Sequence, residues 1–181
     1  MSRERCLAEL KQEQAAKKGD LRMIALKIED LKTFTAQLFM GETFDYWLVR
    51  EANIVTFNSF TIDGRIRQGY YSDEELETNR IEELSSWKTL RPFCYSLIRG
   101  RKLPESFQIT LQLSPEENEK FIRRVKPVAA LYLNIRYENH AAACVTGTSL
   151  KIFMLDKQIE QEWDETVRRY FKKLQIPYVE V

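Results

Sequence analysis

The chain has a single histidine, His140, and only three cysteines, Cys6, Cys94 and Cys144. Serine and cysteine nucleophiles normally rely on a histidine base, and zinc sites use several histidine or cysteine ligands at close spacing. His140 follows an asparagine in a predicted turn, where residues are selected for backbone geometry. Glycine-rich phosphate-binding motifs are also missing. The sequence therefore predicts no catalytic residue, no metal site and no cofactor.

Long apolar runs and an excess of one charge are missing as well. No stretch of about 18 apolar residues occurs, and no apolar leader stands at the N-terminus. The 28 basic and 27 acidic residues give a formal charge of +1, so any charged partner must be recruited by a local patch. We expect a cytoplasmic protein with free thiols and no membrane contact.

Apolar and aromatic residues are abundant enough for a folded core. Hydrophobic residues make up 44% of the 181 positions, and ten Phe, eight Tyr and three Trp are present. This length and composition predict one domain over residues 23–181. Residues 1–22 are rich in charged side chains and predict an N-terminal tail or a frayed helix.

Hydrophobic spacing predicts the order of the elements along the domain. Strand-like alternation appears near 23–28, through 44–71, at 107–113, at 131–137 and in two parts of 142–155, broken near Thr146-Gly147. Helical spacing follows Asp30, Ser114 and Asp156, and a short acidic helix is expected in 72–84, where Ser72 and Glu75 form a capping box. A further helical stripe starts at Trp87, and Pro92 within it predicts a helix that either starts near Arg91 or kinks there. Asp63-Gly64 is a typical hairpin turn.

These elements predict an α+β fold with an antiparallel, hairpin-rich sheet and four helices. Residues 23–71 and 106–155 would each have the order β-α-β-β-β, with an insertion at 72–104 and a C-terminal helix at 156–174. This element order resembles one domain of the DNA processivity clamps. The resemblance has no diagnostic motif, so it implies no functional residues.

Three stretches carry a closer resemblance: FNSFTIDGR at 57–65, SSWKTLRPFCYSLIRG at 85–100 and TGTSLKIFMLDK at 146–157. They are similar to a family of uncharacterised proteins, a domain of unknown function, from anaerobic bacteria of the Firmicutes type. The similarity covers nearly all of residues 23–181. It supports the domain boundaries and implies no activity.

The segment from Trp87 to Lys102 combines positive charge with aromatic side chains and contains no acidic residue. Its candidate binding residues are Trp87, Lys88, Arg91, Arg99, Arg101 and Lys102. Cations that pair with phosphates and aromatic rings that stack on bases are what single-stranded nucleic acids require. Two structural alternatives stay open. The aromatic residues could form the buried face of a helix, and the cations could pair with the acidic run 73–83.

The leading hypothesis is a non-enzymatic binding or scaffold protein that contacts nucleic acid, or another protein, through this basic segment. A rival hypothesis is an enzyme of unrecognised class that uses Cys94 or carboxylates. The carboxylates considered are Asp45, Glu51, Asp63 and Glu138. A third is a structural module that forms homo-oligomers through an apolar patch or an unpaired sheet edge.

Overall fold

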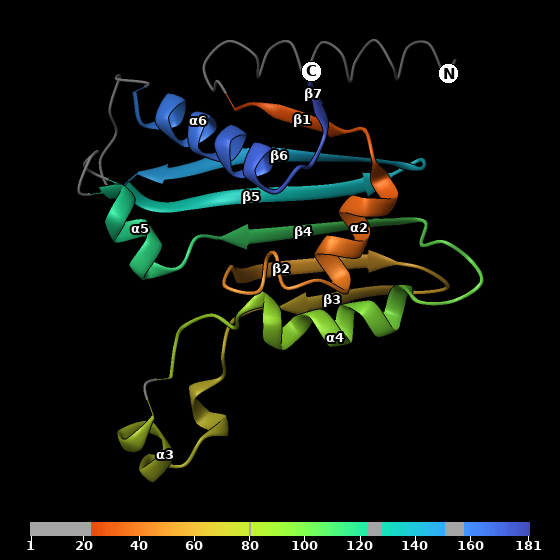
Figure 1. Cartoon of the computed structure of the whole chain (residues 1–181). Helices are drawn as coiled ribbons and strands as arrows, with labels where there is room; N and C mark the ends of the chain where they lie inside the picture. The colour runs from red at the N-terminus through yellow and green to blue at the C-terminus, as the bar shows by residue number, and fades with distance from the viewer. Residues whose placement is uncertain (1–22, 80, 123–127, 151–157) are drawn as a thin grey trace, which may run out of the picture.

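The computed structural model describes residues 23–79, 81–122, 128–150 and 158–181 (Figure 1). The elements in chain order are β1 (Ala25–Ile28), α2 (Leu31–Phe39), β2 (Leu48–Val55), β3 (Ser59–Asp63), the 3-10 turn η1 (Gln68–Tyr70), α3 (Asp73–Thr78), α4 (Trp87–Ile98), β4 (Ser106–Gln112), α5 (Pro115–Ile122), β5 (Val128–Glu138), β6 (Ala141–Leu150), α6 (Gln158–Lys173) and β7 (Tyr178–Glu180). The predicted tail, residues 1–22, lies outside the described residues.

The seven strands form one sheet in the order β3-β2-β4-β5-β6-β1-β7. Every neighbouring pair is antiparallel, and β2-β3 and β5-β6 are hairpins. The predicted α+β class with an antiparallel, hairpin-rich sheet is confirmed. The described residues hold five α-helices, and α3 is the short acidic helix that was expected in 72–84. None of the described helices is long and apolar enough to cross a lipid bilayer.

The two predicted halves differ from each other in the sheet. Residues 23–71 form β1, α2, β2 and β3, one strand fewer than expected. The described part of 106–155 forms β4, α5, β5 and β6, and β6 runs without a break through Thr146 and Gly147. In addition, β4 pairs with β5, whereas β1 lies between β6 and β7, far from β2. The β-α-β-β-β repeat is therefore not seen in the described residues.

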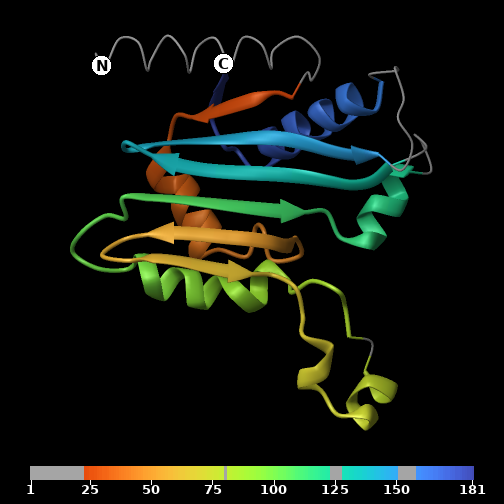
Figure 2. The ribbon, with the colours of Figure 1, turned by 180° about the vertical axis from the view of Figure 1, so that it is seen from behind.

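Helices cover one face of the sheet. Helices α2, α4 and α6 lie in front of the strands in Figure 1, and in the opposite view of Figure 2 none of them lies in front of β2, β4, β5 or β6. The strands alternate accordingly. In β4, Phe107, Ile109 and Leu111 are buried against the helices, whereas Gln108 faces the open side. Period-two alternation is typical of a sheet with one buried face.

Gly64 does not occupy a hairpin turn, which corrects the prediction for Asp63-Gly64. The turn between β2 and β3 lies at residues 56–58, where the Thr56 amide donates to the Asn58 carbonyl at 2.9 Å. Gly64 instead follows β3 and lies against β2. A Cβ atom at this position would be 1.7 Å from the carbonyl oxygen of Val49. Glycine is required here by close backbone approach.

We call residues 66–83 the arm, and its described residues, 66–79 and 81–83, project away from the body of the protein (Figures 1 and 2). The arm contains η1 and α3, and neither has a buried residue. The predicted capping box is confirmed, because the Ser72 hydroxyl accepts from the Glu75 amide at 3.3 Å and the Glu75 carboxylate accepts from the Ser72 amide at 2.8 Å. The arm is joined to the body at a short ladder in which the Ile66 amide donates to the Glu83 carbonyl.

Candidate functional site

Two of the six predicted binding residues have structural roles. Helix α4 begins at Trp87, after Ser86 as N-cap, and runs through Pro92, so it does not start near Arg91. The Trp87 side chain is 0% exposed, and its indole Nε1 donates to the Leu38 carbonyl at 2.7 Å. Arg91 forms an ion pair with the buried carboxylate of Asp45, with Nη2 3.1 Å from Oδ2. These two side chains hold α4 against the body, and neither is free to contact a nucleic acid.

The other four predicted residues, Lys88, Arg99, Arg101 and Lys102, are exposed. None of them forms an ion pair with a described residue, so pairing with the acidic run 73–83 is not seen. The arm that carries this run lies near the start of α4, and the cations of 99–102 follow its end (Figure 1). Phe93 is the exposed aromatic residue of α4, at 62%. Nucleic-acid binding by this segment stays a prediction.

The thiols considered for catalysis are buried. Burial raises the pKa of Cys94 to about 12, and burial also raises the pKa of Cys144. A thiol with a raised pKa carries almost no thiolate near neutral pH, and the thiolate is the nucleophile. Both cysteines instead belong to the hydrophobic core. Burial and a raised pKa therefore favour a structural role for the Cys94 thiol over a role as a nucleophile.

Two of the four predicted carboxylates converge. Glu51 and Asp63 are directly opposite each other on β2 and β3, and both are exposed. The sheet register shifts between Val49 and Glu51, which leaves Arg50 as an extra residue. Such β-bulges often occur next to functional sites, where they redirect a side chain. Asp45 is held by Arg91, and Glu138 lies at the other end of β5.

The carboxylate pair lies in a shallow polar hollow of about 550 Å³. Its lining residues come from strands β2, β3, β4 and β5 and from the segment just after β3. They are Arg50, Glu51, Thr61, Asp63, Arg65, Thr110, Tyr132 and Asn134. Two arginines and two carboxylates give the hollow no net formal charge. Among the described residues, no group of three or more His, Cys, Asp or Glu side chains is arranged to hold a metal ion. The hollow is wide and open, and its lining mixes polar and apolar surface, so it does not exclude water.

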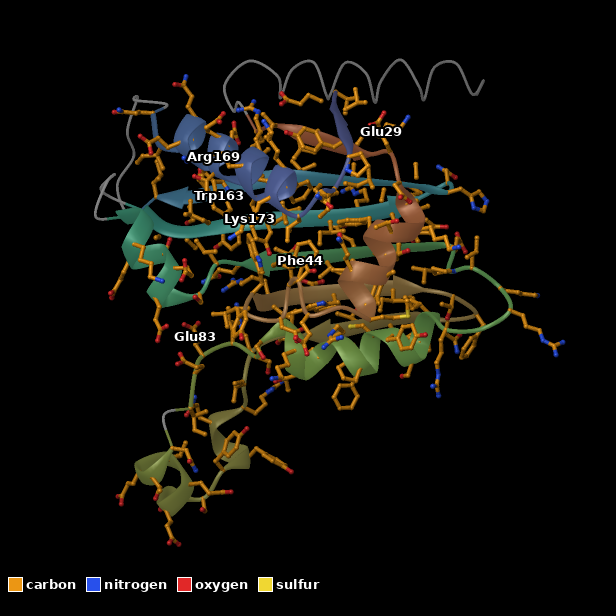
Figure 3. All side chains as sticks on the ribbon, viewed as in Figure 1. Glu29, Phe44, Glu83, Trp163, Arg169 and Lys173 are labelled. Carbon is orange, nitrogen blue, oxygen red and sulfur yellow. The ribbon has the colours of Figure 1, made fainter. Side chains whose placement is uncertain are left out.

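A second cavity lies on the helix-covered face, between α6, the loop before β2 and the start of α5. We call it the aromatic pocket, and its volume is about 510 Å³. Its lining residues are Thr43, Tyr46, Trp47, Leu113, Ser114, Glu117, Lys120, Trp163, Thr166, Val167, Arg169 and Tyr170. In Figure 3, Trp163 and Arg169 lie on α6, on the same side of the sheet as Phe44. Small-molecule sites have this size and are mostly apolar, with a few polar groups.

Aromatic rings make the wall of this pocket. The ring centroid of Trp47 lies 6.1 Å from that of Trp163 and 5.9 Å from that of Tyr170. The polar atoms of these rings already have partners. Trp163 Nε1 donates to the Tyr132 carbonyl at 3.0 Å, Trp47 Nε1 donates to the Tyr170 hydroxyl at 3.4 Å, and that hydroxyl donates to the Thr43 carbonyl at 2.7 Å. The rings therefore offer a ligand their apolar surfaces.

Charged and hydroxyl groups surround the mouth of the pocket. Lys120 and Glu117 form an ion pair one turn apart on α5. Arg169 is exposed, and its guanidinium Nη2 donates to the Thr166 hydroxyl at 3.4 Å. Burial raises the pKa of the Tyr170 phenol, so this side chain is neutral at physiological pH. With Lys120 paired, Arg169 gives the mouth one available positive charge.

The sequence contained part of the signal for this pocket. Trp163, Val167 and Tyr170 recur at helical spacing on the predicted C-terminal helix, a pattern that normally marks a core face. The stripe does pack on the sheet, since Trp163 and Val167 are buried. The residues that complete the cavity, Trp47 and Leu113, come from segments fifty or more positions away. Helical spacing alone does not reveal such contacts.

Comparison with known proteins identifies the family of this chain. Residues 37–179 match a family described as "Family of unknown function (DUF5721)", and the chain belongs to it. The match starts within α2 and ends in β7, so it includes the aromatic pocket, the polar hollow and the arm. No curated protein and no solved structure matches the chain significantly. The expected relationship to an uncharacterised domain family is confirmed at this level.

Proposed function

We propose that this protein is a non-enzymatic binding protein that holds a small planar molecule in the aromatic pocket. The observation that carries the proposal is the convergence of Trp47, Trp163 and Tyr170 on one cavity with their polar atoms already hydrogen-bonded. Rings whose N–H and O–H groups are occupied bind a ligand by stacking and apolar contact. A flat aromatic molecule has the largest surface for such contact.

Arg169 supports a preference for a negatively charged ligand. Its guanidinium lies at the mouth of the pocket and forms no ion pair with a described residue. A guanidinium can hold a carboxylate, sulfonate or phosphate through two parallel hydrogen bonds. The neighbouring Glu117 is neutralised by Lys120 and so repels an anion only weakly. We expect the ring system inside the pocket and the anionic group beside Arg169.

The lining favours binding over catalysis. The described lining residues include no cysteine and no histidine, and the pocket's one carboxylate belongs to Glu117, at the mouth. A general base or nucleophile would have to lie within hydrogen-bond distance of a bound ligand. Apart from its charged residues, the described lining consists of aromatic, aliphatic and hydroxyl side chains, and no histidine lies among them to act as a base for the hydroxyls.

Titration with anilinonaphthalene sulfonate tests this function, and the loss of tryptophan emission measures its binding. We expect saturable binding at one site, since Trp47 and Trp163 line the pocket. Thr166→Trp should abolish binding, because an indole at this half-buried position fills the cavity. Arg169→Gln should weaken binding of the sulfonate about tenfold and leave binding of the neutral parent anilinonaphthalene unchanged.

Lys172→Gln is the matched control for the arginine. It removes an exposed cation from the same helix, and this cation does not line the pocket. Binding that persists in Thr166→Trp would place the probe elsewhere and contradict the proposal. Equal weakening by Arg169→Gln and Lys172→Gln would contradict the assignment of the anionic group to Arg169.

A further inference from the structure

The described part of the arm, residues 66–79 and 81–83, is a structured element that the body of the protein does not support. Neither η1 nor α3 has a buried residue, and both views show α3 apart from the sheet and from the other helices (Figures 1 and 2). A six-residue helix gains little from its own hydrogen bonds, and helices are normally stabilised by packing an apolar face. The capping box holds the shape of α3 but supplies no such face.

The surface of the arm is suited to a positively charged partner. It contains six acidic residues and two arginines, a formal charge of −4. It also exposes apolar surface, because Tyr70 is 84% exposed and packs edge-on against Tyr71 at 5.5 Å. Leu76 of α3 is exposed as well. Exposed aromatic residues within a charged surface are typical of residues that become buried at an interface.

A complementary surface lies at the opposite end of the molecule. The loop after α4 carries Arg99, Arg101 and Lys102, followed by Leu103, which is 69% exposed. The Glu105 amide donates to the Val55 carbonyl at 2.9 Å, which holds this loop beside the β2-β3 turn and its exposed Phe57. We call this surface the basic end. Like the arm, the basic end combines exposed apolar side chains with charged ones. The basic end is positively charged, whereas the arm is negatively charged.

The arm and the basic end cannot meet within one molecule. The arm leaves the sheet at the end of β3, and the basic end includes the start of the same strand (Figure 1). Helix α4 spans the distance between them, and twelve residues of α-helix are about 18 Å long. At this separation direct contact is impossible, and salt screens the remaining attraction at physiological ionic strength. Their complementarity can act only between molecules.

We propose that the arm of one copy of this chain docks on the basic end of a second copy. Two copies side by side in opposite directions place each arm at the other's basic end, so a two-fold dimer forms both contacts at once. Closed two-fold dimers are the commonest homo-oligomers. The acidic side chains of the arm pair with Arg99, Arg101 and Lys102, and Tyr70 packs against the apolar residues beside them. This inference is independent of the aromatic pocket.

Sedimentation velocity of the full chain tests the proposal at micromolar concentrations, with salt raised from about 0.05 to about 0.5 M. We expect a dimer that dissociates as salt increases. An arm reversal combines Glu74→Lys, Glu77→Lys and Glu83→Lys, and leaves the capping residues intact; Figure 3 labels Glu83. A basic-end reversal combines Arg99→Glu, Arg101→Glu and Lys102→Glu. Each reversed protein alone should be a monomer.

An equimolar mixture of the two reversed proteins is the decisive sample. In the arm-reversed protein both docking surfaces have a net positive charge, and in the basic-end-reversed protein both have a net negative charge. Mixing the two proteins should therefore restore the dimer through both contacts. A control with Lys32→Glu, Lys172→Glu and Lys173→Glu reverses three exposed cations outside both surfaces and should stay dimeric. Circular dichroism verifies that every variant is folded. All variants should bind anilinonaphthalene sulfonate as the wild type does.

Three outcomes would overturn the proposal. They are a wild-type monomer at every salt concentration, a dimer that survives either reversal, and a mixture that stays monomeric. Fluorescence anisotropy with labelled single-stranded DNA identifies the alternative occupant. If the wild type is a monomer that binds DNA and the basic-end reversal removes this binding, the basic end contacts phosphates and the arm does not dock there.

Discussion

Gly64→Ala is the substitution whose effect is best defined by the geometry. A Cβ atom at this position would lie 1.7 Å from the Val49 carbonyl oxygen and 2.5 Å from the carbonyl carbon. Both are backbone atoms of β2, so no side-chain rotation can relieve the contact. Gly64 does not have a positive φ, and an alanine would therefore be disfavoured by space rather than by backbone conformation.

The expected cost has two parts. Inserting a methyl group into a closely packed position costs about 1–3 kcal/mol. Relief requires the backbone at 64 to move away from β2, which stretches two hydrogen bonds: Gly64 amide to Arg50 carbonyl at 3.1 Å, and Ser85 amide to Gly64 carbonyl at 2.8 Å. Each such bond contributes about 1 kcal/mol, so we expect the free energy of unfolding to fall by about 3–5 kcal/mol.

Urea unfolding followed by tryptophan emission measures this change. Gly69→Ala and Gly100→Ala are matched controls, because an added Cβ at either position meets no atom within 4 Å. Both controls should keep the free energy of unfolding within about 1 kcal/mol of the wild type, since exposed substitutions without contacts have small effects. A Gly64→Ala protein as stable as the two controls would refute the close-approach explanation.

Two further predictions concern buried carboxylates. Arg91→Leu leaves the Asp45 carboxylate buried without its partner and should lower the free energy of unfolding by about 3 kcal/mol, and adding Asp45→Asn should recover part of that loss in the same urea assay. No recovery would mean that the ion pair is not the cause. Burial raises the pKa of Asp164, which accepts a hydrogen bond from Thr146 at 2.6 Å, so the folded protein retains a proton that the unfolded chain loses. The wild type should therefore lose stability relative to Asp164→Asn as pH rises from about 4, the pKa of an unperturbed Asp, through the raised pKa of Asp164, and a difference independent of pH would contradict this.

Local features of the sequence predicted the secondary structure well. The alternation of Phe107, Ile109 and Leu111 gave strand β4, and the pairing of Ser72 with Glu75 gave the capping box of α3. The stripe through Trp163 and Val167 predicted α6. These features depend on residues within a few positions of each other, and the alternation or helical spacing that they produce is independent of the rest of the chain.

The identities of the functional surfaces could not be obtained in this way. The basic segment was visible as a run of cations, but its sequence does not show that Trp87 is turned inward and donates to Leu38. That orientation follows from α4 packing on α2 and the sheet. The polar hollow needs β3, β2, β4 and β5 to be neighbours, and the aromatic pocket needs α6 to lie beside the loop that precedes β2.

The sequence by itself determined the α+β class, the antiparallel strands and most helix starts. Only the tertiary structure decided that Asp63-Gly64 ends a strand against β2, that β1 pairs between β6 and β7, and that Trp47 meets Trp163. The physical reason is the range of the interactions. Hydrogen bonding and side-chain spacing within an element act over a few residues, whereas strand order and pocket walls depend on contacts between distant segments that form only when the core is packed.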